Sequence, residues 1–340
     1  MTDIAALCKQ RWDNIAKPIG SLGQLEKVVC RLAAIQGTLE VNIDRRVCLV
    51  MCADNGVLQE GVAQTPAFVT ASQSVSIAKG KASVNAIARA ARCDVVTVDV
   101  GILTDIDVPE LIRRKAGRGT ANIAQGPAMT EAQLEQTLRT GMELVREMKE
   151  KGYQIICTGE MGIGNTTTSS AVASVLLGVD PIQITGRGAG LSDEGLVRKL
   201  DAIQRAIAIN QPDKDNPKDV LRKLGGFDIV ALTGIFLGGQ RYQMPIVVDG
   251  VISAVSALAA VRIEPNCADY LIASHVSREP AAALLLQELG LTPLLHADMA
   301  LGEGTGAVAL LPLLDVALAV YRQNSTYEQL DYLPPEMQTH

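Results

Sequence analysis

The residue best suited to chemistry is a single carboxylate, Glu303, in the run LGEGTGA at 301–307. Glycines on both sides let the backbone approach another part of the molecule closely, and they leave the acid few side-chain neighbours. Removal from water disfavours the charged form of a carboxyl group, which suits a proton acceptor working near neutral pH. A helix start, where a glutamate favours the helix dipole, would use the same residues. Spacing alone leaves both interpretations of Glu303 open.

A glycine-rich stretch at 158–172, TGEMGIGNTTTSSAV, is the second candidate. It follows a predicted strand and leads into a predicted helix, and its candidate binding residues are Gly162, Gly164, Asn165, Thr166 and Thr167. Backbone N–H groups at a helix start, with hydroxyl groups beside them, bind anions, so phosphate is the expected ligand. Neither the Gly-Lys-Ser/Thr ending of a Walker loop nor the dinucleotide fingerprint occurs. The alternative is a glycine-rich turn with a threonine cap.

Two weaker candidates also follow predicted strands or precede helices. The stretch ADNGV places Asp54 at a strand end, where it would form an Asx turn or hydrogen-bond a substrate. The stretch ITGRGAGLSDEG precedes a predicted helix that carries Arg198 and Lys199. These cations would neutralise a phosphate or belong to a solvated helix face, and the sequence leaves that choice open.

The sequence predicts no metal site. Its three histidines, His275, His296 and His340, are scattered and lack the spacing of metal ligands. Seven cysteines, an odd number, occur without a CxxC pair, which is typical of reduced thiols in a cytoplasmic protein. No GxSxG elbow and no HExxH motif is present.

Composition narrows the class of protein. Of 340 residues, 48% are hydrophobic and only 20% are charged, and the mean hydropathy is +0.19, as in large parallel sheets covered by helices. A net charge of −6 and 3% aromatic residues argue against a nucleic-acid partner. The start, MTDIAALCKQRWDN, does not resemble a signal peptide, and no run of about 18 uninterrupted apolar residues predicts a membrane span.

Apolar runs alternate with helical patterns along the chain, which predicts a doubly wound, mainly parallel α/β sheet. In such sheets ligands bind outside the carboxyl ends of the strands, near the point where the strand order reverses. Gly and Asp collect at the predicted strand ends, as in a binding rim, although tight turns between strands and helices would favour the same residues. The expected strands lie in RRVCLVMCADNGV, CDVVTVDVGI, YQIICTGEMGIG, GFDIVALTG, MPIVVDG and ADYLIASH.

Taken together, a set of motifs from about residue 10 to 322 resembles the nicotinate-nucleotide–dimethylbenzimidazole phosphoribosyltransferase (CobT) family. The motifs include KPIGSLGQLE, ADNGV, VDVGI, NIAQGPAM, GEMGIGNTT, RAIAINQP, VVDGVISA and LGEGTGA, in this order. The resemblance implies that nicotinate mononucleotide donates its phosphoribosyl group to a lower-ligand base such as 5,6-dimethylbenzimidazole. Nicotinate leaves, and an α-ribotide such as α-ribazole 5′-phosphate forms for cobamide assembly. No cofactor or metal is implied.

The resemblance also implies residue roles. Glu303 matches the family's base, and Glu160, Lys199 and the 162–167 loop match its nucleotide and phosphate site. The acceptor-binding residues that it implies are Asp54, Thr65, Gln73 and Leu301. The chain departs from the family at Asn55, where histidine is usual, and at Ala300, where arginine is frequent. These departures leave benzimidazoles, purines and phenols open as acceptors.

Domain organisation and assembly follow from the same resemblance. It implies a small helical domain of residues 1–40 plus about 308–340, and a large α/β domain of residues 41–307 carrying both substrate sites. It also implies small-molecule substrates and a homodimer, with a heterodimer of homologous subunits as the alternative. A catalytically weak homologue that serves as a partner subunit and a nucleotide hydrolase are the competing functions.

Overall fold

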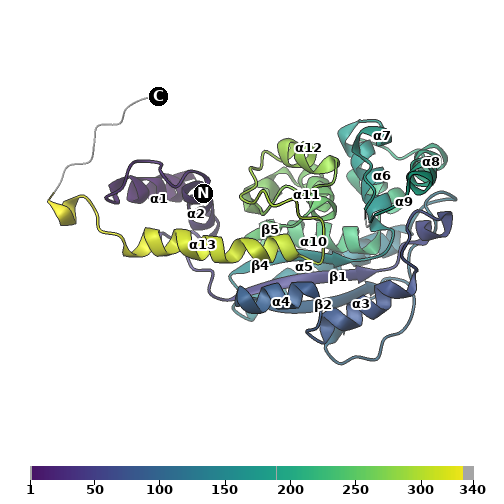
Figure 1. Ribbon diagram of the computed structural model, residues 1–340, viewed down its shortest axis with the longest axis horizontal. Helices are drawn as coiled ribbons and strands as arrows, with labels where there is room; N and C mark the ends of the chain where they lie inside the picture. The colour runs from purple at the N-terminus through teal and green to yellow at the C-terminus, as the bar shows by residue number, and fades with distance from the viewer. Residues whose placement is uncertain (1, 189, 332–340) are drawn as a thin grey trace.

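A parallel sheet forms the centre of the computed structural model, which describes residues 2–188 and 190–331 (Figure 1). Across these residues the sheet has six strands in the order β3-β2-β1-β4-β5-β6, all paired in parallel. The strands are β1 (Arg46–Ala53), β2 (Asp94–Gly101), β3 (Leu111–Arg113), β4 (Ile155–Met161), β5 (Ile246–Val248) and β6 (Leu271–Ala273). The strand order reverses between β1 and β4, which makes their carboxyl ends the expected ligand site. The doubly wound prediction is confirmed.

Helices cover both faces of the sheet (Figure 1). They are α1 (Thr2–Asn14), α2 (Gln24–Gln36), α3 (Phe68–Ala78), α4 (Ser83–Ala90), α5 (Glu131–Glu150), α6 (Asn165–Leu177), α7 (Pro181–Ile184), α8 (Asp193–Asn210), α9 (Pro217–Leu224), α10 (Phe227–Tyr242), α11 (Val251–Ile263), α12 (Ala281–Glu288) and α13 (Thr305–Gln323). Short 3₁₀ turns occupy η1 (Gly56–Glu60), η2 (Pro265–Tyr270) and η3 (Glu328–Leu330).

The continuous apolar sequence of β1 serves two cores. Leu49 and Met51 pack in the core under α5, α6, α10 and α11, whereas Cys48, Val50 and Cys52 pack in the core under α2, α3, α4 and α13. Successive side chains of a strand point to opposite faces of the sheet. A strand that is buried on both faces is therefore apolar at every position, instead of alternating between apolar and polar residues.

One predicted strand is wrong. The run GFDIVALTG, together with the segment after it, forms the single helix α10 rather than a strand and a short helix. Gly234 of α10 packs against Gly141 of α5, and a Cβ on either residue would overlap backbone atoms of the other helix. The two glycines therefore allow close packing, and a helix buried on every side lacks the amphipathic period that identifies helices in a sequence. The three-residue strand β3 was also not predicted.

The N-terminal hairpin of α1 and α2 packs on the far end of α13 (Figure 1). The rings of Trp12 and Tyr321 have centroids 5.0 Å apart, and an antiparallel bridge joins Ile15 to Thr326. This packing supports a helical unit built from both ends of the chain, but α13 runs unbroken across the expected boundary at about 308. The division into domains stays a prediction, and its residues 332–340 lie outside the described chain.

Helix α13 is long and apolar enough to cross a membrane by length and composition alone, with a mean hydropathy of 1.5 over its apolar window. However, 56% of that window is buried inside the protein. The helix begins at the sheet and contains Pro312, and its buried side packs on β4, α2 and α4. These are the features of a core helix.

Candidate active site

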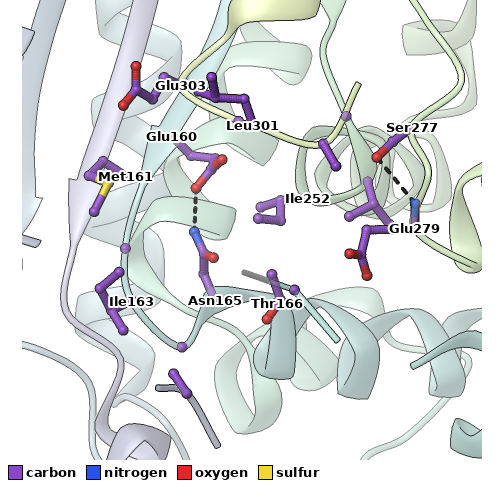
Figure 2. Close-up of a pocket in the computed structure, with 18 of the residues that line it drawn as sticks. Glu160, Met161, Ile163, Asn165, Thr166, Ile252, Ser277, Glu279, Leu301 and Glu303 are labelled. Carbon is purple, nitrogen blue, oxygen red and sulfur yellow. Dashed lines mark hydrogen bonds between the residues drawn. The ribbon is translucent and has the colours of Figure 1, made fainter. Parts of the chain in front are cut away.

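A cavity of about 200 Å³ opens at the carboxyl end of β4. Its walls come from the β4–α6 loop, the start of α11, the segment after β6 and the loop before α13 (Figure 2). The predicted site residues that line it are Thr65, Glu160, Gly162, Gly164, Asn165, Thr166, Leu301 and Glu303. The fold therefore brings together motifs that are scattered over some 240 positions of the sequence, and we call this space the site cavity.

The loop that carries Glu303 has an unusual backbone. Gly302, Glu303 and Gly304 have φ values of 88°, 61° and 92°, so three consecutive residues are left-handed. A Cβ at Gly304 would lie 2.5 Å from Sγ of Cys48, and a Cβ at Gly159 would overlap the Glu303 carbonyl. The glycines let this loop pack directly on the sheet. The left-handed conformation of Glu303 costs on the order of 1–2 kcal/mol, and such strain collects at functional sites.

Two donors hold the Glu303 carboxylate. Gln73 of α3 donates from Nε2 to Oε1 at 2.5 Å, and the backbone N–H of Val84, in the first turn of α4, donates to Oε2 at 3.2 Å. The sequence had suggested an acid with few side-chain neighbours; of its two donors, which α3 and α4 supply, one is a side chain and the other a backbone N–H. The buried carboxylate is thereby fixed in one orientation at the cavity wall.

Glu160, the second acid of the cavity, lies beside the Glu303 loop (Figure 2). A Cβ at Gly302 would lie 2.7 Å from Oε1 of Glu160, so this glycine leaves room for the acid. Asn165 donates to Oε2 of Glu160 at 2.5 Å. Burial, followed by the negative charge of Asp228, raises the pKa of Glu160 to about 8. Glu160 can therefore change its charge near neutral pH, as groups at functional sites often do.

The predicted phosphate site is divided into two layers. Gly164, Asn165 and Thr166, at the start of the 13-residue helix α6, line the cavity, while Thr167 is fully buried within the helix. Lys199 of α8 lies behind the wall and donates from Nζ to Oγ1 of Thr166 and to the carbonyl of Gly186, each at 2.9 Å. Burial lowers the pKa of Lys199 to about 8.

The residues expected to bind the acceptor do not all reach the cavity. Thr65 and Leu301 line it, whereas Gln73 acts through its hydrogen bond to Glu303. Asp54 lies at the end of β1, where its Oδ2 accepts from the backbone N–H of Leu103 at 2.7 Å. It therefore shapes the loop after β2, and its contact with an acceptor stays a prediction.

Seven polar residues that the sequence had not singled out as site residues also line the cavity: Gln64, Arg187, Asp249, Ser253, His275, Ser277 and Glu279. Asp249 accepts from the backbone N–H of Ala307 at 2.9 Å, and burial raises its pKa. Asp249 and His275 lie just after β5 and β6, so the rule that ligands bind at strand ends could have identified both. In the part of the chain that the structure describes, no group of three or more metal-ligating residues occurs.

The family model for phosphoribosyltransferases matches residues 1–330 of this chain. Over 319 residues the chain is 48% identical to the nicotinate-nucleotide–dimethylbenzimidazole phosphoribosyltransferase of Ruminiclostridium cellulolyticum, covering 94% of this chain and 91% of that protein. This chain belongs to that family. A relative of the same name from Acetivibrio thermocellus is 44% identical over 322 residues, covering 95% of this chain and 92% of the relative.

A solved structure of the family has the same fold. The crystal structure of CobT from Thermus thermophilus is 40% identical and matches with a TM-score of 0.93, covering 98% of this chain and all of that one. The resemblance noted in the sequence is confirmed, and the chain is a phosphoribosyltransferase. Asn55, the position of one expected departure from the family, is buried behind the β4–α6 loop and is not among the residues that line the cavity.

Proposed function

We propose that the protein transfers the phosphoribosyl group of nicotinate mononucleotide to an aromatic base. With 5,6-dimethylbenzimidazole the products would be α-ribazole 5′-phosphate and nicotinate, which serves assembly of the cobamide nucleotide loop. The names of its relatives support this reaction. The observation that carries it is the Glu303 carboxylate, which two donors fix at the wall of a cavity whose other wall is the start of α6.

In the proposed reaction the ring nitrogen of the acceptor attacks C1′ of the ribose, and the bond from C1′ to the pyridinium nitrogen breaks. Nicotinate leaves with the bonding electrons, which neutralises its ring, so no strong general acid is needed. Attack on the face opposite to nicotinate inverts the anomeric centre. The acceptor's other ring nitrogen gives its proton to Glu303. Proton transfer of this kind contributes about 10²–10⁴-fold, and positioning two bound reactants supplies up to roughly 7–11 kcal/mol.

The donor phosphate is expected at the start of α6. The positive end of the helix dipole and the hydroxyl of Thr166 favour an anion there. Lys199 adds its charge from behind Thr166, at a hydrogen-bond distance of 2.9 Å. This placement puts the ribose between the phosphate end and the two acids, Glu160 and Glu303. We assign Glu160 to the ribose or to the positive charge that develops at C1′.

The acceptor is expected between Glu303 and the apolar side chain of Leu301, with Thr65 at the edge of the cavity. An azole suits this arrangement because one carboxylate is enough to take its single N–H proton. A phenol would attack through oxygen, and its pKa of about 10, by analogy with tyrosine, would make the reaction depend more strongly on Glu303. We therefore favour benzimidazoles and keep purines and phenols as test substrates.

We also propose that the protein is a cytoplasmic homodimer. All seven cysteines of the described chain are free, as expected in a reducing compartment. Phe68 is 70% exposed, and Leu103 and Leu301 are each more than half exposed. A partner subunit that covered these side chains would remove apolar surface from water. Sedimentation of the purified protein at micromolar concentration tests the dimer, and a monomer would contradict it.

The experiment that tests the proposed reaction is mass spectrometry of product mixtures. The protein is incubated with nicotinate mononucleotide alone and with a panel of azoles, purines and phenols. We expect nicotinate and a ribotide of the acceptor, and no nicotinate when the acceptor is omitted. Release of nicotinate without an acceptor would identify a hydrolase instead. Nucleotide binding by calorimetry without any product would identify a catalytically weak homologue.

A further inference from the structure

Another acid, Asp228, lies directly behind the β4–α6 loop and is not among the residues that line the site cavity. It is fully buried in the first turn of α10. Its Oδ2 accepts from Nδ2 of Asn165 at 3.0 Å, and its Oδ1 accepts from the backbone N–H of Ile229 at 3.0 Å. A buried carboxylate is costly unless hydrogen bonds and a favourable dipole compensate it, and the start of α10 supplies both.

Asn165 connects this acid to the site. Its amide nitrogen carries two protons, and it donates both to Glu160 Oε2 at 2.5 Å and to Asp228 Oδ2 at 3.0 Å. The amide nitrogen of Asn165, rather than its oxygen, faces the two carboxyl groups. Asn165 therefore connects Glu160, in the cavity, to Asp228, behind the cavity wall. The position of Glu160 depends on that of Asp228 through this amide.

Two glycines make room for Asp228. A Cβ at Gly162 would lie 2.6 Å from Oδ2 of Asp228, and a Cβ at Gly226 would overlap Oδ1 of the same residue. Gly162 is itself part of the cavity lining. The loop that receives the donor is thus packed directly onto this carboxylate, and no other residue type fits at 162 without moving it.

Charge couples the two acids as well. Burial raises the pKa of Asp228 to about 6, while its hydrogen bond from Asn165 opposes this rise. After burial, the charge of Asp228 is the largest cause that raises the pKa of Glu160. The other charged or hydrogen-bonding groups that act on Glu160 are Asn165, Asp249 and Glu303.

We propose that Asp228 is a positioning residue of the transferase site, which through Asn165 holds Glu160 and the β4–α6 loop in the geometry that binds the donor. This inference rests on the proposed function for its meaning. A purely structural role for Asp228 would affect folding alone. A positioning role requires that replacing Asp228 also changes donor binding and the titration of Glu160.

The test compares Asp228→Asn with Asp99→Asn. Asp99 is a second buried acid, in β2, which accepts from the backbone N–H groups of Gly101 and Ile102 away from the cavity. Both variants make the same chemical change. For each we would measure the melting temperature, donor affinity by calorimetry, kcat/KM for nicotinate mononucleotide, and the pH profile of kcat/KM.

We expect Asp228→Asn to lower kcat/KM and donor affinity at least tenfold, whereas Asp99→Asn changes them less than threefold. The limb of the pH profile that Glu160→Gln abolishes should move to lower pH in Asp228→Asn by ~0.5 unit or more, because a negative neighbour of Glu160 is gone. If Asp228→Asn does not fold, Asp228→Ser enters the same comparison.

Equal donor affinity and an unmoved limb in the two variants, whatever their melting temperatures, would overturn the inference. Failure of the proposed function would look different, because the parent protein itself would then form no ribotide. Donor affinity still tests the role of Asp228 when the parent forms no ribotide. Weaker donor binding in the Asp228 variant alone supports a positioning role, and equal donor binding in both variants rejects it.

Discussion

Gln73 donates a hydrogen bond of 2.5 Å to the carboxylate of Glu303, and this bond joins two elements that meet only in the folded chain. Gln73 lies on α3 and Glu303 in the loop before α13. The second donor to the carboxylate is the N–H of Val84 at the start of α4. Two helices that lie between β1 and β2 in the chain therefore hold the Glu303 carboxylate, which we propose as the proton acceptor.

Replacing Glu303 by Gln should lower kcat about 10²–10⁴-fold, because an amide of the same shape cannot take the acceptor's proton. The donor KM should change little, since the phosphate end of the cavity is untouched. The measurement is nicotinate release in the presence of an azole. Turnover of the variant at the parent's rate would show that another group is the base.

The change Gln73→Leu should lower kcat roughly tenfold, a smaller loss than that of Glu303→Gln, because the carboxylate keeps its bond from Val84 but gains freedom to turn. The acceptor KM should rise with it. Gln287→Leu, at an exposed position of α12, is the matched control and should leave both constants unchanged. Gln73→Leu with unchanged kcat would mean that one donor is enough to orient the acid.

The stability of the protein should fall as the pH rises from about 4.5 to 8. Glu160 has its pKa raised from 4.5 to about 8, so in this window the folded state holds a proton that the unfolded state has lost. A group of this kind contributes stability at low pH that disappears through its folded pKa, with a slope of at most about 1.4 kcal/mol per pH unit. Urea unfolding at several pH values measures the slope.

The variant Glu160→Gln is the control for that slope, because it removes the titrating group and keeps the shape. Its stability should fall less steeply than the parent's between pH 6 and 8. Asp228 contributes in the same direction only up to about pH 6, where its own raised pKa lies. Equal slopes in parent and variant above pH 6 would contradict the assignment.

Replacing Lys199 by Met should weaken donor binding at least tenfold, because the ammonium group supports Thr166 at the phosphate end. Lys199 has its pKa lowered to about 8, so in the parent this contribution should be lost as the pH rises through 8. Calorimetric titration with nicotinate mononucleotide at pH 7 and 9 measures both effects. Lys218→Met, at a half-exposed lysine paired with Glu135, should bind the donor as the parent does.

The change Gly304→Ala should destabilise the protein by about 2–4 kcal/mol and abolish most activity. Its φ of 92° is strained for alanine, and the new Cβ would lie 2.5 Å from Sγ of Cys48. Gly178→Ala, at the left-handed end of α6 with nothing within 4 Å, should cost only about 1 kcal/mol. The midpoints of urea unfolding of the two variants measure the difference. Equal midpoints would show that the 302–304 loop can shift to accommodate the added Cβ.

Much of the fold could be predicted from the sequence because strand ends carry a local signal. A buried apolar run followed by Gly, Asp or Asn marks β1, β4 and β5, and the site lies at such ends. The helix α10 could not be predicted as one element. Gly234 and Gly141 allow α10 and α5 to pack closely, and this contact is visible only in the folded structure. Asp228 of α10 was consequently missed as well.

The candidate site was predicted less completely than the fold. Glu303 stood out because of its apolar surroundings, but its partners Gln73 and Val84 lie more than 200 positions away and leave no local pattern. Lys199 was expected beside the phosphate, yet it acts from behind Thr166 because α8 packs outside α6. Contacts of this kind depend on how helices are arranged in three dimensions, which residue spacing does not encode.

The aromatic contact between Trp12 and Tyr321 has a consequence for how the protein is made. The ribosome completes α1 and α2 well before α13, on which they pack, has been made. Until then the apolar face of the nascent hairpin has no surface to cover it, and such uncovered segments are prone to aggregate or to bind chaperones. Burial of the first helices therefore waits until α13, which directly follows the 302–304 loop in the chain, has been made.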